Sequence, residues 1–178
     1  MPPTRSLRKT LPLRATIDGQ PVKKGNRLPA ANFGERWATD FFAAAGHRIL
    51  FSKPDLKGTN QPGFDLVTMK NSRVYFIDNK AFMRNGKVYG VSALTRNFPA
   101  NLARFKSTLL RLAQLPRLPA SYKQVLTAAL ASLQKGNYRR VVTNANFGTL
   151  GLHLTGISDA LRKQGILFAN LKKPGKKK

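Results

Sequence analysis

Asp65, Asp78 and Lys80 are the residues of this chain whose types and spacing could perform hydrolytic chemistry. If the two carboxylates face each other about 5 Å apart, they repel by roughly 3 kcal/mol at an effective dielectric constant near 20. A divalent cation turns that repulsion into a binding site, and all-oxygen ligands favour Mg²⁺ or Mn²⁺ ahead of Zn²⁺. A nearby lysine steadies an attacking water or the negative charge that develops on a phosphate.

A β-hairpin is predicted to bring these residues together. Its arms cover 64–69 and 74–82, and its turn at 70–73 is rich in turn-forming residues. Folding about Asn71-Ser72 pairs Asp65 with Asp78, and strand alternation places Asp78 and Lys80 on one face. The alternative is a surface hairpin in which Lys80 forms an ordinary ion pair with one of the two aspartates.

The charge balance of the chain favours the chemical interpretation. Its 178 residues include 32 Lys and Arg against 7 Asp and Glu, for a formal net charge of +25. Such a charge attracts polyanions and gives nucleic-acid affinity that depends on salt. Ribosomal or histone-like proteins share this composition, but they have no need to oppose two carboxylates within a positive surface.

Three regions are predicted along the chain. Residues 1–30 form a basic arm interrupted by prolines, residues 31–171 form one α/β domain, and residues 172–178 form a basic tail. The arm has no signal-peptide pattern, and no apolar run is long enough to cross a membrane. The chain contains no cysteine, which excludes thiolate metal sites, disulfides and cysteine catalysis.

Hydrophobic periodicity predicts the other elements of the domain. Helices are expected over 32–46, 99–114, 121–135 and 158–164, and strands over 47–51, 138–144 and 166–171. The helix over 121–135 is expected to bury Tyr122 and Leu126 on one stripe. The resulting order is helix, three strands, two helices, strand, helix and strand, which is typical of α/β proteins.

Glu35 has two interpretations on the first of these helices. Asn32 and Glu35 are spaced as in a capping box, in which the glutamate bonds back to the cap backbone. The same carboxylate borders the apolar face, where it could ligate a metal through water or orient the nucleophilic water. The two roles are compatible.

Other polar residues carry weaker signals. Several cations are candidates for contacting a polyanion: Lys87, Arg96, Arg104, Arg139 and Arg140. His47 and His153 are assigned no catalytic role, and Phe98 is expected in the core.

The ordered set Glu35, Asp65 and Asp78-Asn79-Lys80 resembles the signature of the PD-(D/E)xK, or restriction-endonuclease-like, nuclease superfamily. The resemblance covers about residues 32–144, with Pro62 three positions before the aspartate rather than beside it. It implies an αβββαβ core whose mixed central sheet is flanked by helices. It also implies that Asp65, Asp78 and the Asn79 backbone carbonyl are metal ligands, that Lys80 is the catalytic lysine, and that Glu35 is the helix carboxylate.

The run from Asp78 to Phe82, with segments 90–95 and 101–102, is similar to nuclease domains of bacterial polymorphic toxins of the contact-dependent inhibition and Rhs systems. That similarity implies delivery into the cytoplasm or nucleoid of a target bacterial cell, and an acidic immunity protein as partner. The sequence thus favours a metal-dependent endonuclease acting on DNA with little sequence specificity. An RNase that cleaves tRNA on the same scaffold and a non-catalytic basic nucleic-acid-binding protein are the alternatives.

Overall fold

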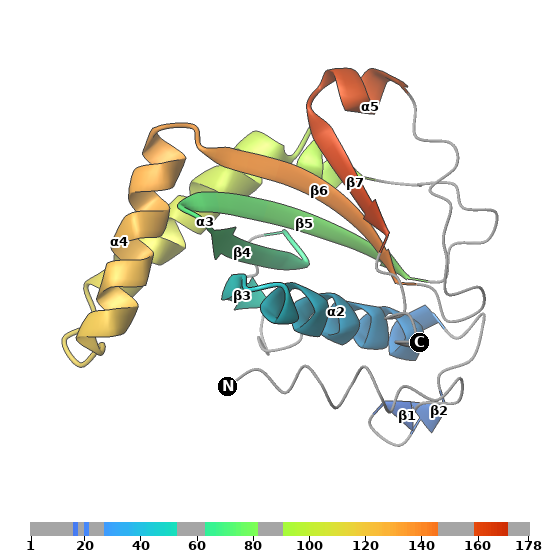
Figure 1. Ribbon diagram of the computed structural model, residues 1–178, viewed down its shortest axis with the longest axis horizontal. Coiled ribbons are helices and arrows are strands. Elements are labelled where there is room, and N and C mark those ends of the chain that lie inside the picture. The colour runs from blue at the N-terminus through green and yellow to red at the C-terminus, as the bar shows by residue number, and fades with distance from the viewer. Residues whose placement is uncertain are drawn as a thin grey trace, which may run out of the picture.

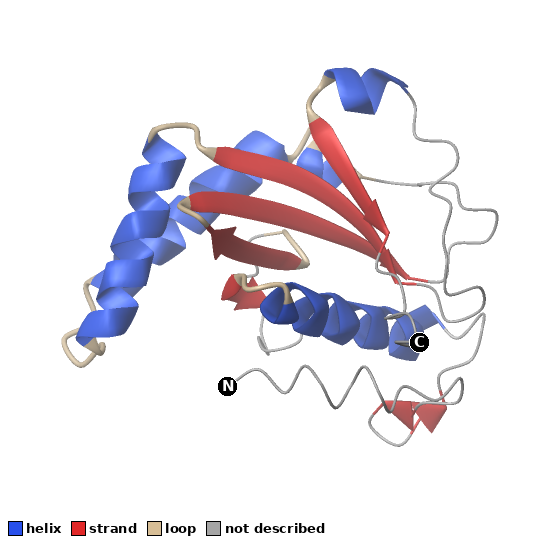
Figure 2. Ribbon diagram, in the orientation of Figure 1, coloured by secondary structure: helices blue, strands red, loops and turns tan. Residues whose placement is uncertain are grey.

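A computed structural model describes residues 16–17, 20–21, 27–52, 63–81, 91–145 and 159–170 of the chain. A five-stranded sheet with helices on both faces organises these residues (Figures 1 and 2). Its strands, in spatial order, are β3 (Arg48–Ser52), β4 (Leu66–Lys70), β5 (Arg73–Ala81), β6 (Tyr138–Ala145) and β7 (Ile166–Asn170). The described helices are α2 (Arg27–Ala44), α3 (Phe98–Ala113), α4 (Ala120–Gln134) and α5 (Asp159–Lys163), with a short 3₁₀ helix, η3, at Ser92–Leu94.

The sheet is mixed and open. β3, β4 and β5 pair antiparallel, whereas β5, β6 and β7 run parallel. The order of elements from α2 to β7 is the one predicted from the sequence, and it defines a mixed α/β fold. A second, two-stranded sheet pairs β1 (Thr16–Ile17) with β2 (Gln20–Pro21) and was not predicted.

The β4–β5 hairpin has the predicted register. Met69 pairs with Val74, and the turn residues Asn71 and Ser72 have φ angles of 50° and 58°. Positive φ at both central residues is the conformation of a two-residue turn whose twist matches that of its strands. The structure corrects one boundary, because β4 begins at Leu66 and Asp65 lies in the bend before it.

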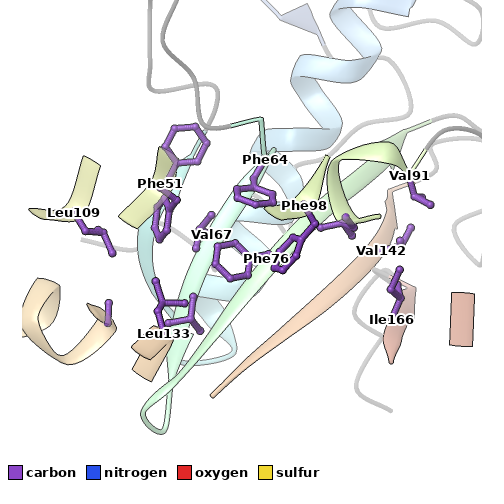
Figure 3. Packing of buried hydrophobic residues seen from close by; sticks show 14 of the residues in the cluster. Phe51, Phe64, Val67, Phe76, Val91, Phe98, Leu109, Leu133, Val142 and Ile166 are labelled. Atoms are coloured by element: carbon purple, nitrogen blue, oxygen red, sulfur yellow. The ribbon is translucent and has the colours of Figure 1, made fainter. Parts of the chain in front are cut away.

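The two faces of the sheet are packed differently. α3 and α4 cover one face over the main hydrophobic cluster, in which Phe76 contacts Phe64, Phe98 and Phe105 with ring centroids 4.6–5.6 Å apart. Figure 3 shows Phe64, Phe76 and Phe98 meeting in the middle of this cluster. α2 covers the other face, where Leu66 and Ile77 are buried.

α2 starts earlier than predicted. The first four N–H groups of a helix have no intrahelical partner, so Pro29 is tolerated in the first turn and the helix starts at Arg27. The prediction of irregular structure through residue 30 is therefore wrong for 27–30. Asn32 lies inside the helix, so the capping box predicted with Glu35 is wrong as well.

Tyr122 is also placed differently from the prediction. It is 52% exposed in the first turn of α4, because the helix meets the core only from Leu126 onward. The other boundaries agree with the predicted elements to within about two residues, as is usual for helix and strand ends. None of the described helices is both long and apolar enough to cross a bilayer.

Candidate functional site

The open end of the β4–β5 hairpin brings Asp65 beside the Asp78-Asn79 segment of β5. The last regular pair is Leu66 with Ile77, and Asp65 leaves this register because its backbone N–H also donates to the Ile77 carbonyl, at 3.2 Å. The Asp65 Oδ2 atom accepts a hydrogen bond from the Asn79 N–H at 2.9 Å. The Asp65 side chain thus continues the strand pairing where regular pairing stops.

The residues before Asp65 fix its approach to the sheet. Gly63 has φ +79°, and a Cβ placed on it would lie 2.4 Å from the Asn101 Oδ1 atom. Asn101 is buried on α3, and its Nδ2 donates to the Ala93 carbonyl at 3.3 Å. Phe64 is buried against Phe76 and Phe98. Only glycine fits this position without strain, so the packing of α3 determines where Asp65 enters the site.

Asp78 is almost fully buried, with 4% of its surface exposed. It lies on β5 two residues after Phe76, so strand alternation places both side chains on the face covered by α3 and α4. The backbone of Lys80 pairs with that of Asn144 on β6, whereas the predicted position of its side chain lies outside what the structure describes. Burial of a carboxylate is unfavourable unless charges or hydrogen bonds compensate it, so Asp78 stands in an environment that selects for positive partners.

Asn79 is a polar residue of the site whose side chain the sequence did not single out. Alternation directs it to the α2 face, where its Oδ1 accepts a hydrogen bond from Thr143 Oγ1 at 2.8 Å. Both residues are buried, and the Asn79 Nδ2 is buried without a hydrogen-bond partner among the described atoms. Because Thr143 comes from β6, more than sixty residues later, no local pattern could have indicated the pair.

Glu35 is buried on α2, at 8% exposure. Its carbonyl accepts a hydrogen bond from Thr39 Oγ1 at 2.9 Å, and Thr39 Oγ1 lies 3.0 Å from Ser52 Oγ on β3. α2 covers the face of the sheet opposite to the one that Asp78 occupies. Across the ranges that the structure describes, no three Asp, Glu, His or Cys side chains converge closely enough to share a metal ion.

The predicted polyanion contacts fall into three groups. Arg96, Arg104 and Arg139 are exposed, whereas Lys87 lies outside the described residues. Arg140 is engaged in the fold: its Nη1 donates to the Leu94 carbonyl at 2.8 Å, its Nη2 donates to the Gln164 carbonyl, and its guanidinium stacks over Phe98 at 5.1 Å.

His47 has a structural environment. Its Nδ1 lies 2.8 Å from Thr68 Oγ1, and its ring packs edge-on against Phe42 and Tyr75. Burial, and secondarily the positive charge of Lys70, lower the pKa of His47 below its usual 6.5. The neutral imidazole is therefore favoured. His153 lies outside the described residues.

No family model matches the chain, and neither a curated protein nor a solved structure is similar to it. The fold class that the structure defines is a mixed α/β fold with an open five-stranded sheet.

Proposed function

We propose that this chain is a metal-dependent nuclease that hydrolyses phosphodiester bonds of DNA. The observation that carries the proposal is the hairpin that sets Asp65 beside the Asp78-Asn79 segment, with the Asp65 carboxylate bonded to the Asn79 N–H, in a chain of net charge +25. Like charges in facing strand positions destabilise a sheet. A protein that binds polyanions gains nothing structural from keeping two acids together, whereas a phosphodiesterase uses them.

The arrangement of the elements supports the same proposal. From α2 to β6 the order is one helix, three antiparallel strands, two helices and a strand parallel to the third. This is the αβββαβ order implied by the resemblance to PD-(D/E)xK nucleases, with α3 and α4 in the place of the second helix. Asp65 lies directly before the second strand of the series and Asp78 lies on the third, at the open end of the hairpin.

The donor set fits a hard divalent cation. Asp65 and Asp78 offer carboxylate oxygens from neighbouring segments, and the Asn79 carbonyl follows Asp78 directly in the chain. Oxygen donors of this kind suit Mg²⁺ or Mn²⁺, which keep part of their water shell and so need few protein ligands. Glu35 lies on α2, which covers the face of the sheet opposite to Asp78, so it is given no part in holding the cation.

The residues of the site have separate roles in the proposed reaction. A bound divalent cation supplies a Lewis acid for the scissile phosphate and lowers the pKa of water. The Asn79 N–H orients the Asp65 carboxylate by the 2.9 Å hydrogen bond. Lys80 stabilises the negative charge that develops on the phosphate oxygens, and the exposed arginines hold the nucleic-acid backbone without reading its sequence.

Purified protein incubated with supercoiled plasmid and with total RNA, each in Mg²⁺ or EDTA, tests the proposal. We expect plasmid cleavage that requires Mg²⁺ and is lost in Asp78→Asn. If only RNA is cleaved, we conclude that the protein is an RNase on the same scaffold. If both substrates survive with Mg²⁺ and with Mn²⁺ while gel shifts show binding, the protein is a non-catalytic nucleic-acid-binding protein.

A further inference from the structure

The charge of the described structure is unevenly distributed. The segment 91–145, which contains η3, α3, α4 and β6, has nine cations and no acidic residue. Seven of these cations are exposed: Arg96, Arg104, Arg111, Arg117, Lys123, Lys135 and Arg139. The acidic residues of the chain all lie outside this segment, so η3, α3, α4 and β6 themselves carry positive charge alone.

α3 organises part of this charge into a stripe. Arg104, Ser107 and Arg111 are exposed and recur at helical spacing, so they share the outward face, while Phe105 and Leu109 are buried on the inward face. Arg104 and Arg111 are two turns apart, which is about 10.5 Å along the axis. If α3 lies parallel to the axis of B-DNA, the two arginines are therefore about three base pairs apart in rise.

The stripe begins beside the candidate catalytic residues. Asn101, in the first turn of α3, contacts Gly63, and Phe98 packs against Phe64, so this turn adjoins the residues that lead into Asp65. From there α3 runs away from the site to the loop before α4, which carries Arg117. A backbone lying along α3 therefore has one end near Asp65 and Asp78.

We propose that the exposed face of α3 is a docking track for the sugar–phosphate backbone of a nucleic-acid duplex, which it directs into the hairpin site. The inference rests on the proposed function and specifies the substrate. The 16 residues of α3 span about 24 Å, or roughly seven base pairs at 3.4 Å each. Substrates that extend at least that far to one side of the scissile bond use the whole track.

Apolar side chains near the end of α3 raise the alternative of a lipid surface. Leu110, Leu115 and Tyr122 are each about half exposed around the α3–α4 loop. A membrane would engage these side chains and the cations close to them, whereas Arg96 and Arg104 lie toward the other end of the helix. Because exposed cations continue from the loop through Arg111 and Arg104 to Arg96, the distribution of positive charge favours an extended polyanion over a planar surface.

Binding measured in EDTA tests the track without depending on cleavage. We compare Arg104→Gln/Arg111→Gln with the control Arg48→Gln/Arg162→Gln, whose arginines are exposed on β3 and α5. Both pairs remove two charges, so net charge is matched. For a 20-base-pair duplex labelled with fluorescein, we expect the track variant to bind about tenfold more weakly and its log–log salt slope to fall by about 1.8, with the control little changed.

Duplex length provides the second arm. Wild-type protein should bind the 20-base-pair duplex more tightly per site than a 6-base-pair duplex, and the track variant should lose most of that preference. Equal weakening by both double variants would overturn the inference, because the effect would then come from net charge. So would binding to anionic phosphatidylglycerol vesicles that depends on Arg104 and Arg111 while duplex binding does not. A protein that cleaves nothing but shows the track-specific loss would refute the proposed function and retain the track.

Discussion

The two ends of the β4–β5 hairpin can be compared residue by residue. At the turn, the Ser72 carbonyl accepts hydrogen bonds from Ser132 Oγ and Asn137 Nδ2, both at 2.7 Å, and Arg73 Nε donates to Asn137 Oδ1 at 3.0 Å. At the open end, Asp65 lies beside the Asp78-Asn79 segment. The hairpin thus has hydrogen-bond partners from α4 and the loop before β6 at one end, and two acids close together at the other.

This difference indicates that the open end of the hairpin is less stable than folding alone would require, as is usual at functional sites. The positive φ angles of Asn71 and Ser72 are compensated by neighbouring hydrogen bonds, so the turn can be explained by folding alone. At the open end two acids lie close together, and the buried Asn79 Nδ2 has no hydrogen-bond partner among the described atoms. Departures from local consistency of this kind concentrate at functional sites.

Asp78→Asn should have the largest effect and should separate activity from stability. We expect cleavage to fall by at least about 10²-fold, since several kcal/mol of charge stabilisation are lost. The thermal midpoint should hold or rise, because the change removes repulsion from Asp65. Asp40→Asn on α2 is the matched control and should cleave like wild type. If Asp78→Asn lost stability in proportion to activity, the open end would have a structural role like that of the turn.

Gly63→Ala should damage the open end through its backbone. The new methyl group meets Asn101 at 2.4 Å and sits at φ +79°, so we expect a loss of about 2–4 kcal/mol in urea unfolding together with reduced cleavage. Removal of the obstacle in Gly63→Ala/Asn101→Ala should recover part of the stability. If the single variant unfolds like wild type, α3 does not fix the entry to Asp65.

Ser132→Ala tests the turn end. Ser132 is buried and donates to the Ser72 carbonyl, so its loss should cost about 1 kcal/mol in urea unfolding. Asn137 continues to bond the same carbonyl, which limits the effect. Cleavage under conditions where the variant is folded should equal that of wild type. Reduced cleavage by the folded variant would show that the two ends are coupled.

The smallest expected effect is on the pH dependence of stability, to which His47 contributes. Its pKa is lowered in the folded state, so the unfolded chain binds more protons as the pH falls below 6.5. The contribution to stability is therefore present above pH 6.5 and is lost as the pH falls toward the lowered value. Thermal midpoints measured between pH 5 and 8 should decline more steeply in wild type than in His47→Gln. If the midpoints of the two proteins fell in parallel, groups other than His47 would cause the pH dependence of stability.

Local sequence patterns account for the register of the hairpin. Turn residues at 71–72 and alternation in both arms predicted the pairing from Lys70–Arg73 to Leu66–Ile77, but not the departure of Asp65 from that register. Periodicity likewise placed α3 and α4, whose buried faces repeat every three to four residues. These signals are short in range, and so they could be read from one sequence.

Contacts between distant segments could not be predicted in the same way. The Gly63–Asn101 contact and the Asn79–Thr143 hydrogen bond each join residues far apart in the chain. From the sequence, Arg140 could not be distinguished from the other cations, because its hydrogen bonds to Leu94 and Gln164 also join distant segments. The start of α2 was missed because Pro29 was taken as a helix breaker, although the first turn tolerates it.

Thermal unfolding with and without Mn²⁺ tests most directly the claim that the open end is a metal site. A ligand that binds only the folded state at a hundred times its dissociation constant stabilises it by about 2.7 kcal/mol. We predict that Mn²⁺ raises the midpoint of wild type and of Asp40→Asn but not of Asp65→Asn or Asp78→Asn. Equal shifts in all four proteins, or none in wild type, would contradict the account.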